Sequence, residues 1–258
     1  MKIAVVAPSN PVPPDVPDRV APLVPAGVEL VFHPQCFLSE GHFAGPDRAR
    51  EDAFVEMAND PSVDRIWFGR GGYGANRIAE RAADRLDATG RGKTFMGYSD
   101  GGFLLAALDQ LGCRVLHGPM PGDIRRQGGE AAVARALAGL LDAPTASRPQ
   151  LAFNLTVLSA LLGTPLEPDF AGRVLMVEEV DEHHYRLDRL LFHVTSSANV
   201  RGCAGLMLGR CDPIPVNDVA FDADEETIAS YWCARAGIPY LGRADIGHDA
   251  DNKVVPFG

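Results

Sequence analysis

Hydrophobic residues in the first half of the chain form short apolar runs that alternate with helix-like segments. The apolar runs predict strands over residues 2–7, 28–33, 64–69, 94–97 and 114–117. Between them, apolar positions with helical spacing predict helices over residues 46–59, 75–86 and 103–111. Strands separated by such helices indicate right-handed βαβ crossovers and a parallel sheet. We therefore expect an α/β fold with a Rossmann- or flavodoxin-like N-terminal domain.

The second half of the chain has a different pattern. A helix predicted over residues 128–141 is followed by a Pro-, Ser- and Thr-rich stretch at 142–150, which indicates a linker near residue 145. Further along, we expect helices over residues 155–162, 186–192 and 224–236 and strands over residues 174–178, 200–208 and 238–241. The pattern predicts two domains, 1–143 and 144–258. The smaller C-terminal α/β domain is expected to hold a mixed sheet, with a cleft between the two domains.

One motif at the end of a predicted strand suggests chemistry: Gly97-Tyr98-Ser99-Asp100-Gly101. A nucleophilic serine needs a tight strand-to-helix turn, which glycines two residues before and after it permit. The helix that follows would point free N–H groups at an oxyanion formed beside Ser99. Because an ordinary glycine-rich turn has the same pattern, the motif alone does not assign a function.

A second glycine-rich loop, Arg70-Gly71-Gly72-Tyr73-Gly74, follows another predicted strand. Its spacing fits neither of the common phosphate-binding motifs. The carboxyl ends of parallel strands meet at one edge of a sheet, so this loop and Ser99 could converge there. Backbone N–H groups of the loop would then suit an oxyanion hole, and a plain turn is the alternative.

A serine nucleophile also needs a base and a carboxylate that orients the base. Of the seven histidines, His248 is the best candidate, because it follows Asp245-Ile246-Gly247 on a flexible segment at a strand end. Glu178 and Glu179 end a strongly apolar predicted strand. Alternation places these two side chains on opposite faces, so only one of them can be the partner. A solvated acidic turn is the alternative for the pair.

Composition narrows the classes of function. The chain has 258 residues and a net charge of −10 with no basic run, which argues against nucleic-acid binding. No apolar stretch approaches the roughly 20 residues of a membrane helix, and the N-terminus is typical of a first strand, not of a signal peptide. Five scattered cysteines fit free thiols in a reducing cytoplasm. We expect a cytoplasmic protein that binds no nucleic acid or membrane and needs no metal or other cofactor.

Taken together, these motifs resemble the LD-carboxypeptidase family, serine peptidases of the S66 type. The resemblance covers nearly the whole chain. Besides the two glycine-rich motifs, it includes Ala7-Pro8-Ser9, His117-Gly118-Pro119-Met120, Asn154-Leu155, residues 161–165, Glu178-Glu179-Val180, residues 185–189 and Gly247-His248. The two glycine-rich elements in this order are specific to the family, whereas the later motifs are looser.

The resemblance implies a Ser-Glu-His triad split between two domains. Ser99 would be the nucleophile, Glu178 the orienting acid and His248 the general base. Glu178 is preferred to Glu179 because the family's acid is the first of its acidic pair. Such enzymes remove the terminal D-amino acid from murein tetrapeptides during peptidoglycan recycling in the cytoplasm, and the resemblance makes a homodimer plausible.

The resemblance also implies a substrate-binding region around the nucleophile. The oxyanion donors would be the backbone N–H groups of Asp100 and of Gly71 or Gly72. A carboxypeptidase must also recognise a free carboxylate, for which arginine is the natural partner. The candidates for that role are Arg70, Arg186 and Arg243.

Two departures from the family pattern bear on the substrate. Ala152-Phe153 stands where many relatives have two glycines, and the segment 243–246 replaces an aromatic, Pro-containing stretch. Three alternatives stay open: a hydrolase of the related branch that inactivates peptide–nucleotide antibiotics, an α/β-hydrolase acting on an ester, and a non-catalytic peptide-binding relative.

Overall fold

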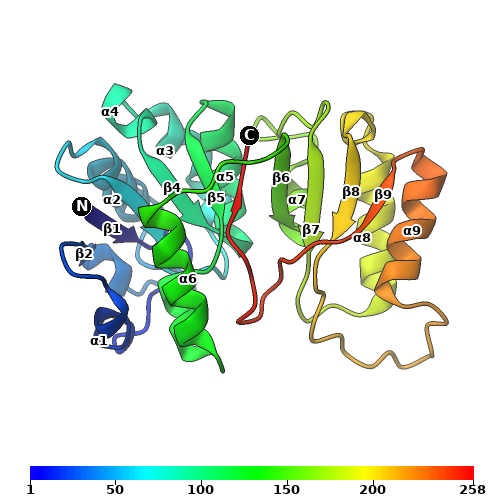
Figure 1. The fold of residues 1–258 in the computed structure, drawn as a ribbon, viewed down its shortest axis with the longest axis horizontal. Coiled ribbons are helices and arrows are strands. Elements are labelled where there is room, and N and C mark those ends of the chain that lie inside the picture. Colours follow the sequence, from blue (N-terminus) through cyan, green and yellow to red (C-terminus); the bar gives the residue numbers. More distant parts are fainter.

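Two β-sheets lie side by side in the computed structural model, which describes residues 1–258 (Figure 1). The first sheet has the strand order β10-β5-β4-β3-β1-β2. Its strands are β1 (Lys2–Val6), β2 (Glu29–Phe32), β3 (Arg65–Phe68), β4 (Thr94–Gly97), β5 (Arg114–His117) and β10 (Val255–Pro256). Strands β1 to β5 are parallel, and β10 pairs antiparallel with β5.

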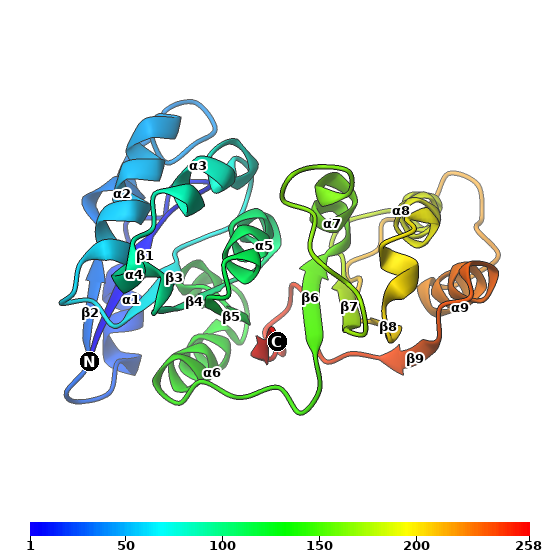
Figure 2. The same ribbon diagram turned by 90° about the horizontal axis from the view of Figure 1, so that it is seen from above.

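Helices cover both faces of the first sheet, as Figure 2 shows. One face carries α2 (Asp47–Asn59), α3 (Ala79–Asp84) and α5 (Gly102–Gln110), and the other carries α1 (Val16–Val20) and α6 (Gly129–Leu141). The short α4 (Ala88–Arg91) precedes β4. A separate apolar core fills each face, because successive residues of a central strand point to opposite sides. The predicted α/β architecture of this half is confirmed.

The second sheet has the strand order β6-β7-β8-β9. Its strands are β6 (Gln150–Asn154), β7 (Val174–Glu178), β8 (Gly205–Leu208) and β9 (Tyr240–Arg243), and α7 (Leu155–Leu161), α8 (His184–Ser196) and α9 (Glu225–Ala236) accompany them. All neighbouring strands are parallel, so the mixed sheet expected here is wrong in that detail. The antiparallel strand is β10, which crosses back to the open edge of β5 in the first sheet.

Two segments differ from their predicted structure. The strand expected over residues 200–208 begins only at Gly205, because Val200–Gly202 forms a 3-10 turn after α8. Strand β6 begins at Gln150, at the end of the segment predicted as a linker. All five residues of β6 are buried, so this strand, which the sequence pattern did not predict, lies in the interior. The connection between α6 and β6 covers residues 142–149, one residue less than the predicted linker.

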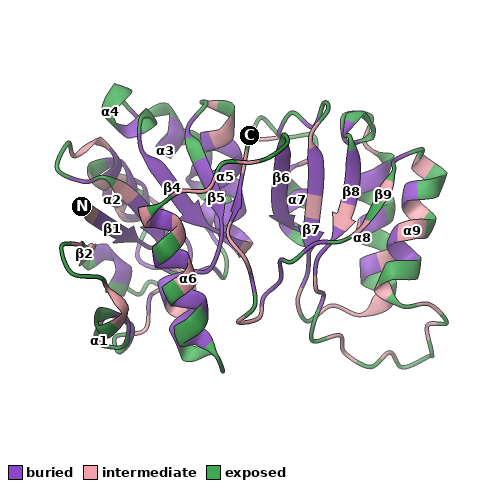
Figure 3. Ribbon diagram, in the orientation of Figure 1, coloured by how far each residue is buried: buried purple, intermediate pink, exposed green.

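The two sheets share one continuous apolar core. Helix α5 packs against α7, and a Cβ on Gly102 would lie 3.0 Å from the Val157 side chain. The rings of Phe153 and Phe257 meet at 5.3 Å between centroids, so the end of the chain contacts β6. In Figure 3 the inner strands of both sheets are mostly buried, whereas the outer faces of the helices are exposed. The outermost strands β2 and β9 contain only intermediate and exposed residues. None of the helices is long and apolar enough to span a membrane.

Candidate active site

Ser99 lies in a sharp turn between β4 and α5. Its φ is +57°, a left-handed conformation that costs a non-glycine residue about 1–3 kcal/mol. The flanking glycines explain how the turn fits. A Cβ on Gly97 would lie 2.4 Å from Cδ2 of Phe68, and one on Gly101 would lie 2.8 Å from the same atom. Phe68 at the end of β3 therefore leaves no room for a larger residue at either position.

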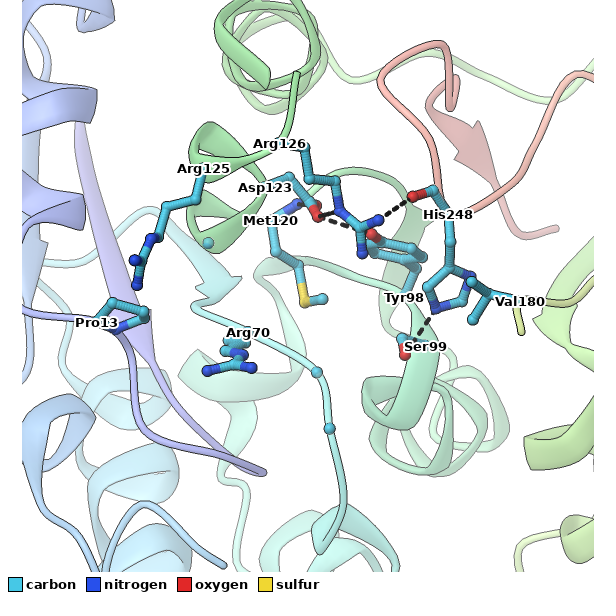
Figure 4. Close-up of a pocket in the computed structure, with 13 residues that line it drawn as sticks. Pro13, Arg70, Tyr98, Ser99, Met120, Asp123, Arg125, Arg126, Val180 and His248 are labelled. Atoms are coloured by element: carbon cyan, nitrogen blue, oxygen red, sulfur yellow. Dashed lines mark hydrogen bonds and ion pairs between the residues drawn. The ribbon is translucent and has the colours of Figure 1, made fainter. Parts of the chain in front are cut away.

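Ser99, His248 and Glu178 form a hydrogen-bonded chain (Figure 4 shows the first two). The Oγ of Ser99 lies 3.0 Å from Nε2 of His248. The Nδ1 of the same ring lies 2.5 Å from Oε2 of Glu178. Ser99 follows β4 of the first sheet, whereas Glu178 ends β7 of the second. The structure thus brings together, from both sheets, the three residues that the sequence placed in one site.

Burial sets the electrostatics of this chain. Glu178 is fully buried, which raises the pKa of its carboxyl above the usual value. Burial by itself lowers the pKa of His248, but attraction and the hydrogen bond to Glu178 outweigh it, so the pKa of His248 is raised. A carboxylate on Nδ1 leaves Nε2 as the nitrogen that can accept a proton from Ser99.

Glu179 has a different role from its neighbour. Its Oε1 accepts hydrogen bonds from Nδ2 of Asn154 (2.7 Å) and from the N–H of Val180 (3.0 Å). Its Oε2 accepts hydrogen bonds from the N–H (2.9 Å) and the hydroxyl (2.7 Å) of Thr156. All of these partners lie in the second half of the chain, at the start of α7 and after β7. Glu179 therefore holds these segments together, and Glu178 is the member of the pair that contacts His248.

The glycine-rich loop after β3 lies directly beside Ser99. A Cβ on Gly71 would lie 2.9 Å from Oγ of Ser99, so only glycine fits at this position. Gly72 has a φ of +115°, and a Cβ there would collide with the Asn10 side chain. The N–H groups of Gly71 and Gly72 donate no hydrogen bond within the protein. Free backbone N–H groups next to a serine hydroxyl suit the stabilisation of an oxyanion.

Asp100 and Arg50 bind the end of the glycine-rich loop that follows β3. The Asp100 carboxylate accepts hydrogen bonds from the Ser9 hydroxyl (2.5 Å) and from the N–H of Ala75 (2.8 Å). Burial raises the pKa of Asp100. The fully buried Arg50 donates to the Gly74 carbonyl at 2.8 Å and to the carbonyl of Pro8. The Asp100 side chain thus supports the loop, while its N–H lies in the first turn after Ser99.

Two arginines of the first half of the chain hold the segment that carries His248. Arg126 donates a hydrogen bond to the His248 carbonyl and another, at 2.9 Å, to Asp123. Arg135 of α6 donates to the carbonyls of Ala250 (3.0 Å) and Asn252 (2.9 Å). Sequence reasoning missed both arginines, because more than 110 positions separate each from its partner in the chain.

Tyr98 supports the imidazole from the side. Its buried ring lies 4.9 Å from the ring of His248 between centroids. Its hydroxyl donates to Asp123 at 2.8 Å, so Tyr98 joins the same network as Arg126. On the other side, Tyr98 contacts His117, whose burial lowers its pKa to about 3. His117 is therefore neutral, and neither of its ring nitrogens forms a hydrogen bond with Ser99.

A cavity of about 470 Å³ opens over Ser99 (Figure 4). Its lining includes Arg70, Gly71 and Gly72, as the sequence suggested, and also Arg125 and Arg126, which sequence reasoning missed. Two other candidate arginines lie elsewhere. Arg186 pairs with Glu182, and Arg243 lies 3.3 Å from Glu225. The structure contains no cluster of three or more His, Cys, Asp or Glu side chains suited to a metal ion, and all five cysteines are buried and unpaired.

Comparisons with known proteins agree with this fold. The LD-carboxypeptidase N-terminal domain matches residues 3–118, and the LD-carboxypeptidase C-terminal domain matches residues 151–258. The chain therefore belongs to the LD-carboxypeptidase family, the S66 serine peptidases, and is a hydrolase of that family. Its α/β fold and glycine-flanked serine are those that the resemblance implied.

Individual relatives match over nearly the full chain. A probable murein peptide carboxypeptidase of Bacillus subtilis is 29% identical over 99% of this chain and 86% of its own length. The crystal structure of muramoyltetrapeptide carboxypeptidase from Oxalobacter formigenes superposes with a TM-score of 0.87 and 27% identity, covering 100% of this chain and 93% of the other. MccF in complex with glutamyl sulfamoyl guanosine shares the fold, with a TM-score of 0.82 at 16% identity over 100% of this chain and 91% of its own.

Proposed function

We propose that the protein is a serine carboxypeptidase that hydrolyses an L,D-peptide bond and releases the terminal D-alanine of a murein tetrapeptide. The observation that carries this proposal is the hydrogen-bonded chain from Ser99 through His248 to Glu178 beside the Gly71–Gly72 loop. The names of the relatives, a murein peptide carboxypeptidase and a muramoyltetrapeptide carboxypeptidase, support this choice of substrate.

Acylation follows from the positions of these groups. Ser99 Oγ attacks the carbonyl of the scissile bond, and Nε2 of His248 takes the hydroxyl proton. Glu178 stabilises the imidazolium through Nδ1. The backbone N–H groups of Asp100 and of Gly71 or Gly72 stabilise the oxyanion. When the intermediate collapses, His248 gives its proton to the amine of the leaving D-alanine, and an ester remains on Ser99.

Deacylation uses the same groups, with water in place of Ser99 as the attacking group and Ser99 as the leaving group. Water attacks the ester carbonyl while His248 accepts a proton from it. Ser99 then leaves with that proton, and the shortened peptide carries the new carboxylate. The residues come from both proposed domains, 1–143 and 144–258, so the site requires both sheets. We place this reaction in the cytoplasm, in peptidoglycan recycling, and the protein in a homodimer, as the family resemblance implies.

Mass spectrometry of the products tests the proposal. Full-length protein is incubated with a murein tetrapeptide ending in D-alanine, next to Ser99→Ala and Ser159→Ala. The last variant is a matched control, because Ser159 also contacts a histidine, His193, at 2.7 Å but outside the cavity. Loss of one D-alanine with wild type and Ser159→Ala only is the expected result. Cleavage by Ser99→Ala, or no cleavage by wild type, would refute the proposal.

A further inference from the structure

Two arginines in the cavity over Ser99 form no hydrogen bond to a carboxylate. In Figure 4, Arg70 and Arg125 lie near Pro13, on the side of the cavity away from His248. The only hydrogen bond of Arg70 is a long one, 3.5 Å, to a backbone carbonyl. The nearest carboxylate to Arg125 is Asp15, at 3.7 Å. Both side chains are exposed, and the ion pair of Arg125 with Asp15 is exposed too, so a ligand can reach both guanidinium groups.

The third arginine of the cavity differs from this pair. Arg126 is bound to Asp123 at 2.9 Å and to the backbone carbonyl of His248. Asp123, the only acidic residue that lines the cavity, also accepts a hydrogen bond from Tyr98. The acid inside the cavity is therefore already paired. Arg70 has no carboxylate partner, and Arg125 has only Asp15, which lies outside the cavity lining. The two arginines make this part of the surface cationic in a chain whose net charge is −10.

The two arginines line the same cavity as Ser99. Arg70 directly precedes Gly71, where a Cβ would lie 2.9 Å from Oγ of Ser99. Gly122 lies against the side-chain stem of Arg70, and its N–H donates to the carbonyl of Gly69 at 2.9 Å. Because Arg125 follows Gly122 by three residues, the two loops present both guanidinium groups to one cavity. An extended peptide advances about 3.3–3.6 Å per residue. When Ser99 attacks the carbonyl before the last residue, the terminal carboxylate of that residue therefore still lies inside this cavity.

We propose that Arg70 and Arg125 together bind the terminal carboxylate of the peptide substrate. The inference rests on the proposed carboxypeptidase function, in which the residue that leaves carries that carboxylate. Paired guanidinium groups provide charge-assisted hydrogen bonds with a geometry that fits a carboxylate. This site selects peptides that end one residue after the scissile bond, because only those place a carboxylate there.

Binding measurements separate this inference from the proposed reaction. In a Ser99→Ala background the affinity is measured by calorimetry for three peptides: a murein tetrapeptide ending in D-alanine, the same peptide with a terminal carboxamide, and the same peptide with its other carboxylates amidated. Three proteins are compared. The first carries Ser99→Ala alone, the second carries Ser99→Ala with both Arg70→Gln and Arg125→Gln, and the third carries Ser99→Ala with Arg48→Gln. Arg48 is a control for lost charge, because its side chain is 90% exposed on α2, outside the cavity.

The ratio of affinities for the free acid and the terminal amide is the decisive quantity. We expect Ser99→Ala to bind the acid about 10- to 100-fold more tightly, which is typical of hydrogen bonds between charged groups. The ratio should fall close to one when both arginines are replaced, and stay unchanged with Arg48→Gln. The single variants Arg70→Gln and Arg125→Gln give intermediate ratios and serve if the combined variant does not fold.

Three results would overturn the inference: equal affinity for acid and amide in Ser99→Ala, a full preference for the acid without both arginines, or loss of affinity when only the other carboxylates are amidated. The last result would mean that a side-chain carboxylate occupies the site. Failure of the wild-type protein to cleave the tetrapeptide would refute the proposed reaction instead. The affinity ratio still decides the role of Arg70 and Arg125 in that case.

Discussion

Replacing Glu178 by glutamine tests how the buried carboxylate acts on the base. Glu178→Gln keeps the size of the side chain but removes the charge 2.5 Å from Nδ1 of His248. That charge is the reason why the pKa of His248 is raised although the ring is only 7% exposed. Without it, burial is the largest remaining effect, and the nearby Arg126 acts in the same direction, so the pKa of His248 should fall below its usual value of about 6.5.

The sign of the effect on activity follows from the role of the base. His248 accepts a proton only when it is neutral, so kcat/KM of the wild-type protein should fall as the pH drops through the raised pKa of His248. In Glu178→Gln this acid limb should move to lower pH. The maximal rate should also fall, by about 10⁴-fold, which is the loss seen when the orienting carboxylate of a Ser-His-Asp triad is neutralised.

The assay is the pH dependence of kcat/KM for tetrapeptide cleavage, measured for both proteins between about pH 4.5 and pH 8.5, which is about two units on either side of the usual histidine pKa. Glu179→Gln is the matched control, because Glu179 bonds to Asn154 and Thr156 and not to His248. It should move the acid limb much less than Glu178→Gln does, because Glu179 contributes less than Glu178 to the raised pKa of His248. An acid limb of Glu178→Gln that stays in place or moves to higher pH would refute the assigned contact between Glu178 and His248.

Three further substitutions test other parts of the site. Gly71→Ala should lower kcat by about 10²- to 10³-fold in steady-state kinetics, because its methyl group would displace the N–H groups of the loop from the nucleophile. Arg126→Gln should lower kcat about tenfold with KM little changed, because it frees the His248 carbonyl. Gly97→Ala should lower the free energy of unfolding in urea by about 1–3 kcal/mol, because the new Cβ would meet the Phe68 ring at 2.4 Å.

Each of these substitutions has a matched control. Gly92→Ala adds a methyl group where the nearest neighbours are 3.5 Å away, so neither rate nor stability should change much. Arg81→Gln removes an exposed arginine paired with Glu51 and should leave kcat intact. Full activity of Gly71→Ala would argue against the loop as an oxyanion hole. An unchanged kcat in Arg126→Gln would remove its positioning role, and wild-type stability of Gly97→Ala would contradict the tight packing of the turn.

Much of the fold was predictable from the sequence, because apolar runs, helical spacing and turn glycines are features of neighbouring residues in the chain. The strands β1 to β5 are apolar runs of four or five residues, and the helices between them show helical spacing. The turn at Ser99 was predictable because two glycines two residues away are a local signature of a close approach. In contrast, β10 contains only Val255 and Pro256 on a sheet edge, and two residues show no periodicity.

The site was less predictable because its contacts are distant in the sequence. Alternation placed Glu178 and Glu179 on opposite faces but did not say which of them meets His248. The structure decides this, since only Glu178 approaches the imidazole. Arg126 contacts the His248 carbonyl across 122 positions of the chain, and no local pattern marks such a pair. Arg125 was missed for the same reason, because its place in the cavity depends on how two loops pack.

Covalent labelling of Ser99 tests the central claim most directly. Full-length protein is treated with a fluorophosphonate, digested and analysed by mass spectrometry, next to His248→Ala. The account predicts stoichiometric modification of Ser99 in the wild-type protein and a rate lower by orders of magnitude in His248→Ala, because His248 removes the hydroxyl proton. No modification of Ser99, or an equal rate in both proteins, would contradict the assignment of Ser99 as a nucleophile activated by His248.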